Sequence, residues 1–222
     1  MKLNKILPLI ILLLFSTLLF SSNIPSLEYH SSDNINSYLK KEKEMHGRGS
    51  AEQDWFSHLS NFLNITTTSS SNLEKKYSSK KSIDKIYSTA WVEGKKDEGI
   101  NEWIQVKIGL KGKYRKKRTV YFRLISLFSG LGDKKYFFKN NRIKIMHCII
   151  KNGNSEKKYL INLKDKFEIQ HFFIPWKNKI ELNSKNPNVT IKFLIKEVYK
   201  GTKWNDTCLS DISFSGMYWD RE

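Results

Sequence analysis

Short segments with the alternation or β-branched content of β-strands, separated by turn sequences, constrain the fold of this chain most strongly. Three strand-like segments are Trp103–Ile108, Thr119–Ile125 and Val189–Ile195. Turn-forming residues occupy 130–133, 152–154 and 186–188. No long amphipathic helical pattern lies between these segments, as a βαβ sheet would require. The pattern therefore predicts an all-β domain built as an antiparallel sandwich or barrel.

The first 22 residues have the pattern of an export signal. Lys2 and Lys5 precede a mainly apolar run from Ile6 to Phe20, and small residues follow it. The run is shorter than the roughly 20 residues that span a bilayer comfortably. We therefore expect a signal peptide over residues 1–22 and an exported protein that is secreted, periplasmic or at the cell surface. An uncleaved anchor is the alternative.

Residues 23–65 differ in composition from the strand-rich part of the chain. Residues 23–45 are rich in Ser, Asn, Lys and Glu, which is typical of a tether. Ser50 and Gln53 form a capping-box pair ahead of a short amphipathic helix. Its apolar residues recur at helical spacing and are Trp55, Phe56, Leu59, Phe62 and Leu63. This helix either docks on the domain or binds a membrane or a partner.

The predicted domain follows this arm. Thr66–Ser71 has the composition of a linker, and the sandwich is expected over residues 66–217, with a short tail at 218–222.

The chain is strongly basic. Its formal net charge is +17, and 15 of these charges remain without Lys2 and Lys5. Such an excess favours acidic partners, among them anionic lipid, acidic protein and acidic glycans, without selecting a specific nucleic acid. The densest part, expected to be an exposed hairpin or loop, includes Lys113, Arg115, Lys116, Lys117 and Arg118.

The two cysteines allow two interpretations. In an exported chain, Cys148 and Cys208 could form a disulfide, which would contribute on the order of 4 kcal/mol by closing a long loop. Alternatively they are two buried thiols. Cys148 shares a strand face with Met146 and Ile150, as a small core residue would.

The sequence offers little for catalysis or metal binding. The five histidines are scattered, none at metal-ligand spacing from another His, Cys or acid. The glycine-rich phosphate loops, the nucleophile elbow and the zinc motif HExxH are all missing from the sequence. His147 and Cys148 are adjacent, so on a strand they point to opposite faces. The sequence therefore predicts a protein that is not an enzyme and that uses no cofactor or metal.

Four sequence blocks resemble a known family. They are Ser88–Gly94, Ile100–Ile104, Asn140–Lys144 and Glu197–Ile212. In order and spacing they resemble the NAD glycohydrolase translocation domain, a factor V/VIII type C, discoidin-like domain. The resemblance covers about residues 66–216. It implies a galactose-binding-like jelly-roll β-sandwich whose end loops recognise glycans or cell surfaces. The NAD-cleaving chemistry of such proteins lies on a separate domain, so no such activity is carried over.

Two features of this chain depart from the pattern of that family. Relatives often carry an Asp-Gly-Asp loop, sometimes beside a calcium ion, where this chain has Asp84 followed by Lys85. The lysine brings positive charge to a place where a hard cation needs oxygen ligands. The basic run that begins at Lys111 is also denser than the family pattern.

The resemblance and the side-chain chemistry together indicate a recognition site on the loops. Aromatic rings cover the apolar face of a sugar, and amide, guanidinium and carboxylate groups satisfy its hydroxyls. The candidate ligand-binding residues are Tyr136, Asn141, Arg142, Trp204 and Asp206. A structural network is the alternative, in which Arg142 pairs with Asp206 or Glu93. Trp91 and Trp103 are expected to be core or near-core anchors.

Two functions follow from these observations. The first is a non-catalytic recognition module for glycans or cell surfaces. The second is a charge-driven adhesin for anionic membranes or polyanions.

Overall fold

The computed structural model describes residues 24–31, 34–35, 37, 62–116 and 118–220. The expected signal peptide over residues 1–22 and most of the expected helix near Trp55 lie outside these residues, and both stay predictions.

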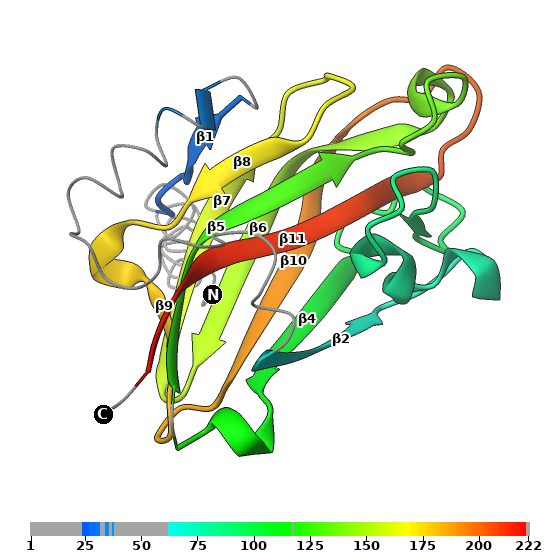
Figure 1. Ribbon diagram of the computed structural model, residues 1–222. Helices are drawn as coiled ribbons and strands as arrows, with labels where there is room; N and C mark the ends of the chain where they lie inside the picture. Colours follow the sequence, from blue (N-terminus) through cyan, green and yellow to red (C-terminus); the bar gives the residue numbers. More distant parts are fainter. Residues whose placement is uncertain (1–23, 32–33, 36, 38–61, 117, 221–222) are drawn as a thin grey trace, which may run out of the picture.

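The chain forms two packed layers of β-strands (Figure 1). The layer that we call the front sheet contains β1 (Glu28–His30), β8 (Gln170–Phe173), β9 (Ile180–Leu182), β5 (Arg118–Ser129), β11 (Thr207–Asp220) and β3 (Trp91–Val92). The back sheet contains β7 (Ser155–Asn162), β6 (Asn141–Asn152), β10 (Asn188–Tyr199), β4 (Trp103–Leu110) and β2 (Leu63–Ser69).

The strand ladders within each layer are antiparallel, and a short parallel ladder between β11 and β6 joins the layers. Thr207 and Cys208 of β11 pair with Asn141 and Arg142 of β6, so β11 crosses from one sheet to the other at its first residues. This β-sandwich confirms the predicted fold class. The predicted strand segments all lie inside longer strands, namely β4, β5 and β10.

The core lies between the two sheets because alternate residues of each strand point inward. In β10, Val189, Ile191, Phe193 and Ile195 are almost fully buried, while the residues between them are partly exposed. The largest fully buried side chain is Trp91 of β3, as expected for a core anchor. Trp103 differs, since it is half-buried and lies under the ammonium of Lys192 at 4.1 Å from the ring centre.

Among the described residues, five short 3₁₀ helices occur in the connections between strands. They are η1 (Lys75–Tyr77), η2 (Ser79–Ile83), η3 (Gly112–Tyr114), η4 (Phe137–Lys139) and η5 (Trp176–Asn178). The predicted turn at 152–154 is confirmed, because Asn152 pairs with Ser155 and Gly153 adopts a φ of 58°, which glycine tolerates best.

The predicted tether is wrong for residues 25–30, which fasten one side of the sandwich. The amide of Leu160 in β7 donates to the carbonyl of Pro25, and the amide of Leu27 donates to the carbonyl of Leu160. Glu28–His30 then pairs with β8 of the other sheet. The side chain of Leu27 is buried in the main core, so this segment, which we call the N-terminal clasp, belongs to the domain.

Two further predictions are corrected. The proposed linker at Thr66–Ser71 is wrong, because Leu63–Ser69 forms β2 and pairs along its length with β4. The proposed disulfide is also wrong, because Cys148 and Cys208 are free buried thiols. Cys148 lies in the main core, as the alternative interpretation required, and His147 points to the opposite, partly exposed face of β6.

The basic run connects β4 to β5 at one end of the sandwich, where the short green helix lies at the bottom of Figure 1. Lys113, Arg115 and Lys116 are exposed there, as predicted. Arg118 is half-buried, and its guanidinium lies 3.9 Å from the ring centre of Phe62. Lys117 lies outside the described residues.

Within the described part of the chain, the structure contains no helix with the length and hydrophobicity of a membrane span. Among the same residues, no three His, Cys, Asp or Glu side chains are grouped so that they could hold a metal ion.

Candidate ligand-binding site

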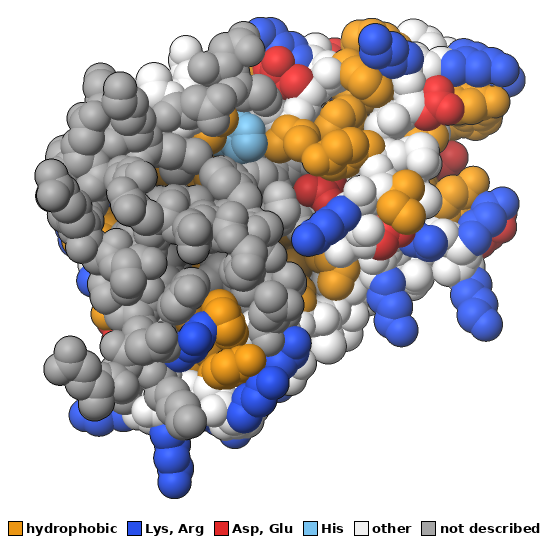
Figure 2. Space-filling model, in the orientation of Figure 1, with side chains coloured by type: hydrophobic (Ala, Val, Ile, Leu, Met, Phe, Trp, Pro, Cys, Tyr) orange, Lys and Arg blue, Asp and Glu red, His pale blue; other side chains and the backbone are white. Residues whose placement is uncertain are grey.

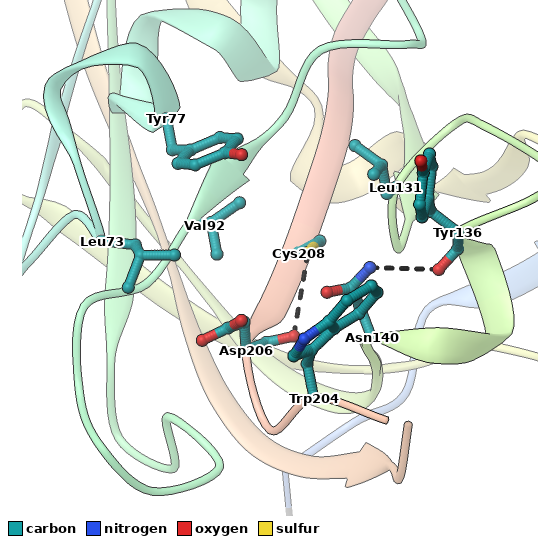
Figure 3. Close-up of a pocket in the computed structure, with 9 residues that line it drawn as sticks. All are labelled: Leu73, Tyr77, Val92, Leu131, Tyr136, Asn140, Trp204, Asp206 and Cys208. Carbon is teal, nitrogen blue, oxygen red and sulfur yellow. Dashed lines mark hydrogen bonds between the residues drawn. The ribbon is translucent and has the colours of Figure 1, made fainter. Parts of the chain in front are cut away.

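A pocket of about 470 Å³ opens at the end of the sandwich opposite the basic run. Its position follows from the strand pairing, because the loops before β6, β11 and β3 meet where β11 crosses from one sheet to the other. The nine lining residues in Figure 3 are Leu73, Tyr77, Val92, Leu131, Tyr136, Asn140, Trp204, Asp206 and Cys208. We call this the loop-end pocket.

Two aromatic residues form one side of the loop-end pocket. The rings of Tyr136 and Trp204 have centroids 6.2 Å apart and are tilted by 42°, and both side chains are half-buried. Tyr77 lies across the pocket from Trp204 (Figure 3). Such partly exposed rings offer apolar faces to a ligand without being filled by the protein core.

Polar groups at the pocket come from Asn140 and Asp206. The side-chain amide of Asn140 donates to the carbonyl of Tyr136 at 3.0 Å, which fixes its orientation (Figure 3). Burial raises the pKa of the Asp206 carboxyl, and none of the described residues donates a hydrogen bond to that carboxylate. A hydroxyl group of a ligand would supply the missing donor.

The rim of the pocket is basic. The ammonium of Lys203 lies 4.7 Å from the ring centre of Trp204, and those of Lys139 and Lys135 lie 5.2 and 5.4 Å from the ring of Tyr136. In Figure 2 hydrophobic side chains gather toward the upper right of the visible face, bordered by Lys and Arg.

Asn141 does not line the pocket but holds its loops together. The side chain is fully buried, and its amide donates to the carbonyl of Asn205 at 2.6 Å while its carbonyl accepts from the amide of Gly201 at 2.7 Å. A Cβ at Gly201 would come within 2.5 Å of the carbonyl oxygen of Lys139, so only glycine allows this approach. Asn141 thus fixes the 200–206 loop against the start of β6.

Arg142 is likewise a structural residue. Its guanidinium donates to both carboxylate oxygens of Asp165, at 3.0 and 2.8 Å, and to the carbonyls of Asn140 and Lys200 at 2.8 and 3.0 Å. All these bonds satisfy a side chain that is only 4% exposed. The alternative prediction, that Arg142 belongs to a structural network, is therefore correct. The expected partners, Asp206 and Glu93, were wrong.

Glu93 has a separate role beside the same loops. Its carboxylate accepts hydrogen bonds from the amides of Lys95 and Thr207, at 2.7 and 3.3 Å. Burial raises the pKa of Glu93, and these two bonds oppose that effect. Glu93 therefore ties the loop after β3 to the start of β11.

The structure thus brings together Tyr136, Trp204 and Asp206 from the predicted site and places Asn141 and Arg142 behind them. Sequence reasoning missed Leu73 and Tyr77, which lie between β2 and β3 in a stretch without strand periodicity. It also missed Cys208, which the sequence offered only as a disulfide partner of Cys148 or as a buried thiol.

The chemistry of the pocket suits binding. Among the described residues that line the pocket, Asp206 provides the carboxylate and Asn140 the amide. Burial raises the pKa of the Cys208 thiol far above its usual range, so the thiol stays protonated and is a poor nucleophile.

The loop before β3 shows what replaces the Asp-Gly-Asp sequence of relatives. Asp84 accepts hydrogen bonds from the hydroxyl of Thr89 and from the amide of Ile86, so its carboxylate serves the loop itself. Lys85 occupies the position of the glycine with a φ of 63°, a left-handed conformation that costs a non-glycine residue about 1 kcal/mol or more.

Comparison with known proteins places this chain in a family. Residues 55–215 match the family model described as NAD glycohydrolase translocation F5/8 type C domain. No curated protein matches the chain.

Several solved structures are similar in fold. A Clostridium perfringens ZmpB structure with two CBM32 domains has 13% identity and a TM-score of 0.49. The match covers 88% of this chain but only 41% of the ZmpB chain. An F5/8 type C domain from Bacteroides fragilis has 12% identity and a TM-score of 0.43, covering 71% of this chain and 93% of its own. A chitosan-binding module from Paenibacillus sp. IK-5 has 15% identity and a TM-score of 0.42, and the match covers 69% of this chain and 96% of that module.

Proposed function

This chain belongs to the NAD glycohydrolase translocation F5/8 type C domain family, and from that premise we propose that it binds glycans of a cell surface in the loop-end pocket. The description of the family as a translocation domain of the F5/8 type C kind supports a non-catalytic binding module. The identity of the ligand and its location outside the cell are parts of the proposal.

The observation that carries this proposal is the pairing of partly exposed aromatic faces with a half-buried carboxylate that accepts no hydrogen bond from the described residues. Trp204 and Tyr136 can cover the apolar face of a pyranose ring, while Asp206 and the amide of Asn140 face its hydroxyl groups. A volume of about 470 Å³ is within the range of small-molecule sites and accommodates one or two sugar rings.

The hydrogen bonds behind the pocket support its role as a binding site, because they hold its loops in one conformation. Asn141, Arg142 and Glu93 fix the loops from behind, so the rings of Trp204 and Tyr136 are held in place before a ligand arrives. A preformed site loses less conformational entropy when it binds, and affinity rises accordingly.

A glycan array probed with the full chain, followed by titration of the best glycan, tests this function. We expect Trp204→Ala and Tyr136→Ala each to weaken binding about tenfold or more, equivalent to about 1.4 kcal/mol, with unchanged thermal midpoints. Lys116→Gln, at the far end of the sandwich, is the matched control and should bind normally. If no glycan binds, or if both aromatic variants bind as well as the parent chain, the proposal is wrong.

A further inference from the structure

A second pocket, of about 290 Å³, lies where the two sheets separate beside β2. It is bounded by β2 and β4 of the back sheet, by β11 of the front sheet, and by η2 with the loop that follows it. The lining residues are Leu63, Ile65, Ile83, Lys85, Tyr87, Ile108, Asp211, Ile212, Ser213, Phe214 and Ser215. We call it the seam pocket, and it shares no lining residue with the loop-end pocket.

One group in the seam pocket stands out from its apolar walls. Asp211 is 3% exposed, and its Oδ1 atom has no hydrogen-bond partner among the residues that the structure describes. A buried carboxylate oxygen without a donor is costly, so native proteins rarely keep one unless it has a partner to bind. The rest of the lining is mainly apolar, with Ile65, Ile108 and Phe214 among its hydrocarbon walls, while Lys85, Tyr87, Ser213 and Ser215 add polar groups.

The charged groups around Asp211 do not satisfy it. Lys85 is exposed at the mouth of the pocket, and no ion pair joins its ammonium to Asp211 in the described part of the chain. Asp84 is occupied by Thr89 and Ile86. The strands β2 and β4 contribute only Leu63, Ile65 and Ile108 to the lining, none of which ionises.

We propose that the seam pocket binds a small apolar amine, with its ammonium group at the carboxylate of Asp211 and its hydrocarbon body against β2, β4 and β11. An ammonium supplies both the missing donor and the opposite charge, and the walls cover an alkyl or aryl group of modest size. A metal ion fits the pocket poorly, because a single carboxylate and apolar walls lack the six or more oxygen ligands that calcium needs. Tyr87, 44% exposed and stacked on Phe128, adds an aromatic face beside the cation.

The titration of Asp211 adds a second readout. Burial raises its pKa to about 6, an effect that the charge of Asp84 increases and that Lys85 and a hydrogen bond from Ser213 oppose. At neutral pH the carboxylate is ionised, and below about pH 6 it is protonated. Amine binding should therefore weaken as the pH falls through 6.

Titration of the full chain with benzylamine, followed by NMR or calorimetry, tests the proposal. Benzyl alcohol and benzoate serve as neutral and anionic analogues of nearly the same shape. We expect benzylamine to bind at least tenfold more tightly than either analogue. Asp211→Asn should reduce amine affinity at least tenfold, and Lys85→Gln should increase it several-fold by removing a competing cation.

Two further variants locate the site. Ile65→Trp should fill part of the seam pocket while keeping Asp211, and should abolish binding, whereas Trp204→Ala alters only the loop-end pocket and should leave amine binding unchanged. Ile65→Trp also carries the test should Asp211→Asn fail to fold. The proposal is overturned if benzylamine does not bind at about 10 mM, if benzyl alcohol binds equally well, or if the Asp211→Asn or Ile65→Trp variant retains full affinity.

Discussion

At the scale of single residues, the loop-end pocket separates side chains that face a ligand from side chains that hold the walls. Trp204 and Asp206 have exposed surface in the pocket, whereas Asn141 is fully buried behind it. The sequence predicted all of them as a site because an amide, an indole and a carboxylate all suit a sugar. Burial alone distinguishes their roles.

Asn141→Ala tests that distinction. We expect the substitution to lower the free energy of unfolding by about 2 kcal/mol or more, because it leaves the amide of Gly201 and the carbonyl of Asn205 without partners. Denaturant unfolding measures this loss, with Thr202→Ala, on the exposed part of the same loop, as a control. An Asn141→Ala protein that is fully stable but has lost glycan binding would show that Asn141 contacts the ligand directly.

At the scale of secondary structure, strands were predictable and their partners were not. The alternation in Val189–Ile195 is a local property, and β10 contains all of it. Thr66–Ser71 lacks large apolar residues, so nothing local distinguishes an edge strand from a linker there, and only the pairing with β4 makes it a strand. The partner of Arg142 escaped prediction for the same reason, because Asp165 lies in a connection outside the recognised blocks.

A pair of proline substitutions tests the role of β2. Its ladder with β4 includes the bond from the amide of Lys111 to the carbonyl of Phe62 and the bond from the amide of Ser70 to the carbonyl of Trp103. The alternation of an antiparallel ladder then turns the amide of Thr66 toward β4 and that of Thr67 away from it. Thr66→Pro should destabilise the protein by about 3 kcal/mol, and Thr67→Pro by much less.

Thermal or denaturant unfolding of the two proline variants provides the comparison. Equal and small effects would mean that the segment behaves as a linker in solution, as its composition predicted.

At the scale of the whole molecule, the two features that the sequence identified as candidates for binding lie at opposite ends of the sandwich. The family blocks meet at the loop-end pocket, and the basic run joins β4 to β5 at the other end (Figure 1). The sequence placed both on loops, which is correct for Trp204 and Asp206 and for Lys113 and Arg115, whereas Asn141 and Arg142 are buried at the start of β6. It gave no measure of the separation between the two features, which depends on the direction of each strand.

This separation predicts that the basic run binds polyanions independently of glycan binding in the loop-end pocket. The triple substitution of Lys113, Arg115 and Lys116 by Gln should lower the salt concentration that elutes the protein from a heparin column. It should leave glycan affinity unchanged, because screening at physiological salt limits electrostatic effects to about 8 Å. Unchanged elution would show that the basic run only interacts with water, and a loss of glycan affinity would show that the two ends are coupled.

The position of β11 also determines when the domain can fold during synthesis. β5 ends at Ser129, but its longest-paired partner, β11, begins only at Thr207, so the front sheet cannot be completed until the intervening chain has been made. At about 5–20 residues per second this delay lasts several seconds. The N-terminal clasp also cannot pair with the front sheet early in synthesis, because its partner β8 begins only at Gln170. Because so many contacts join residues that are distant in sequence, we expect the domain to complete its fold only late in synthesis.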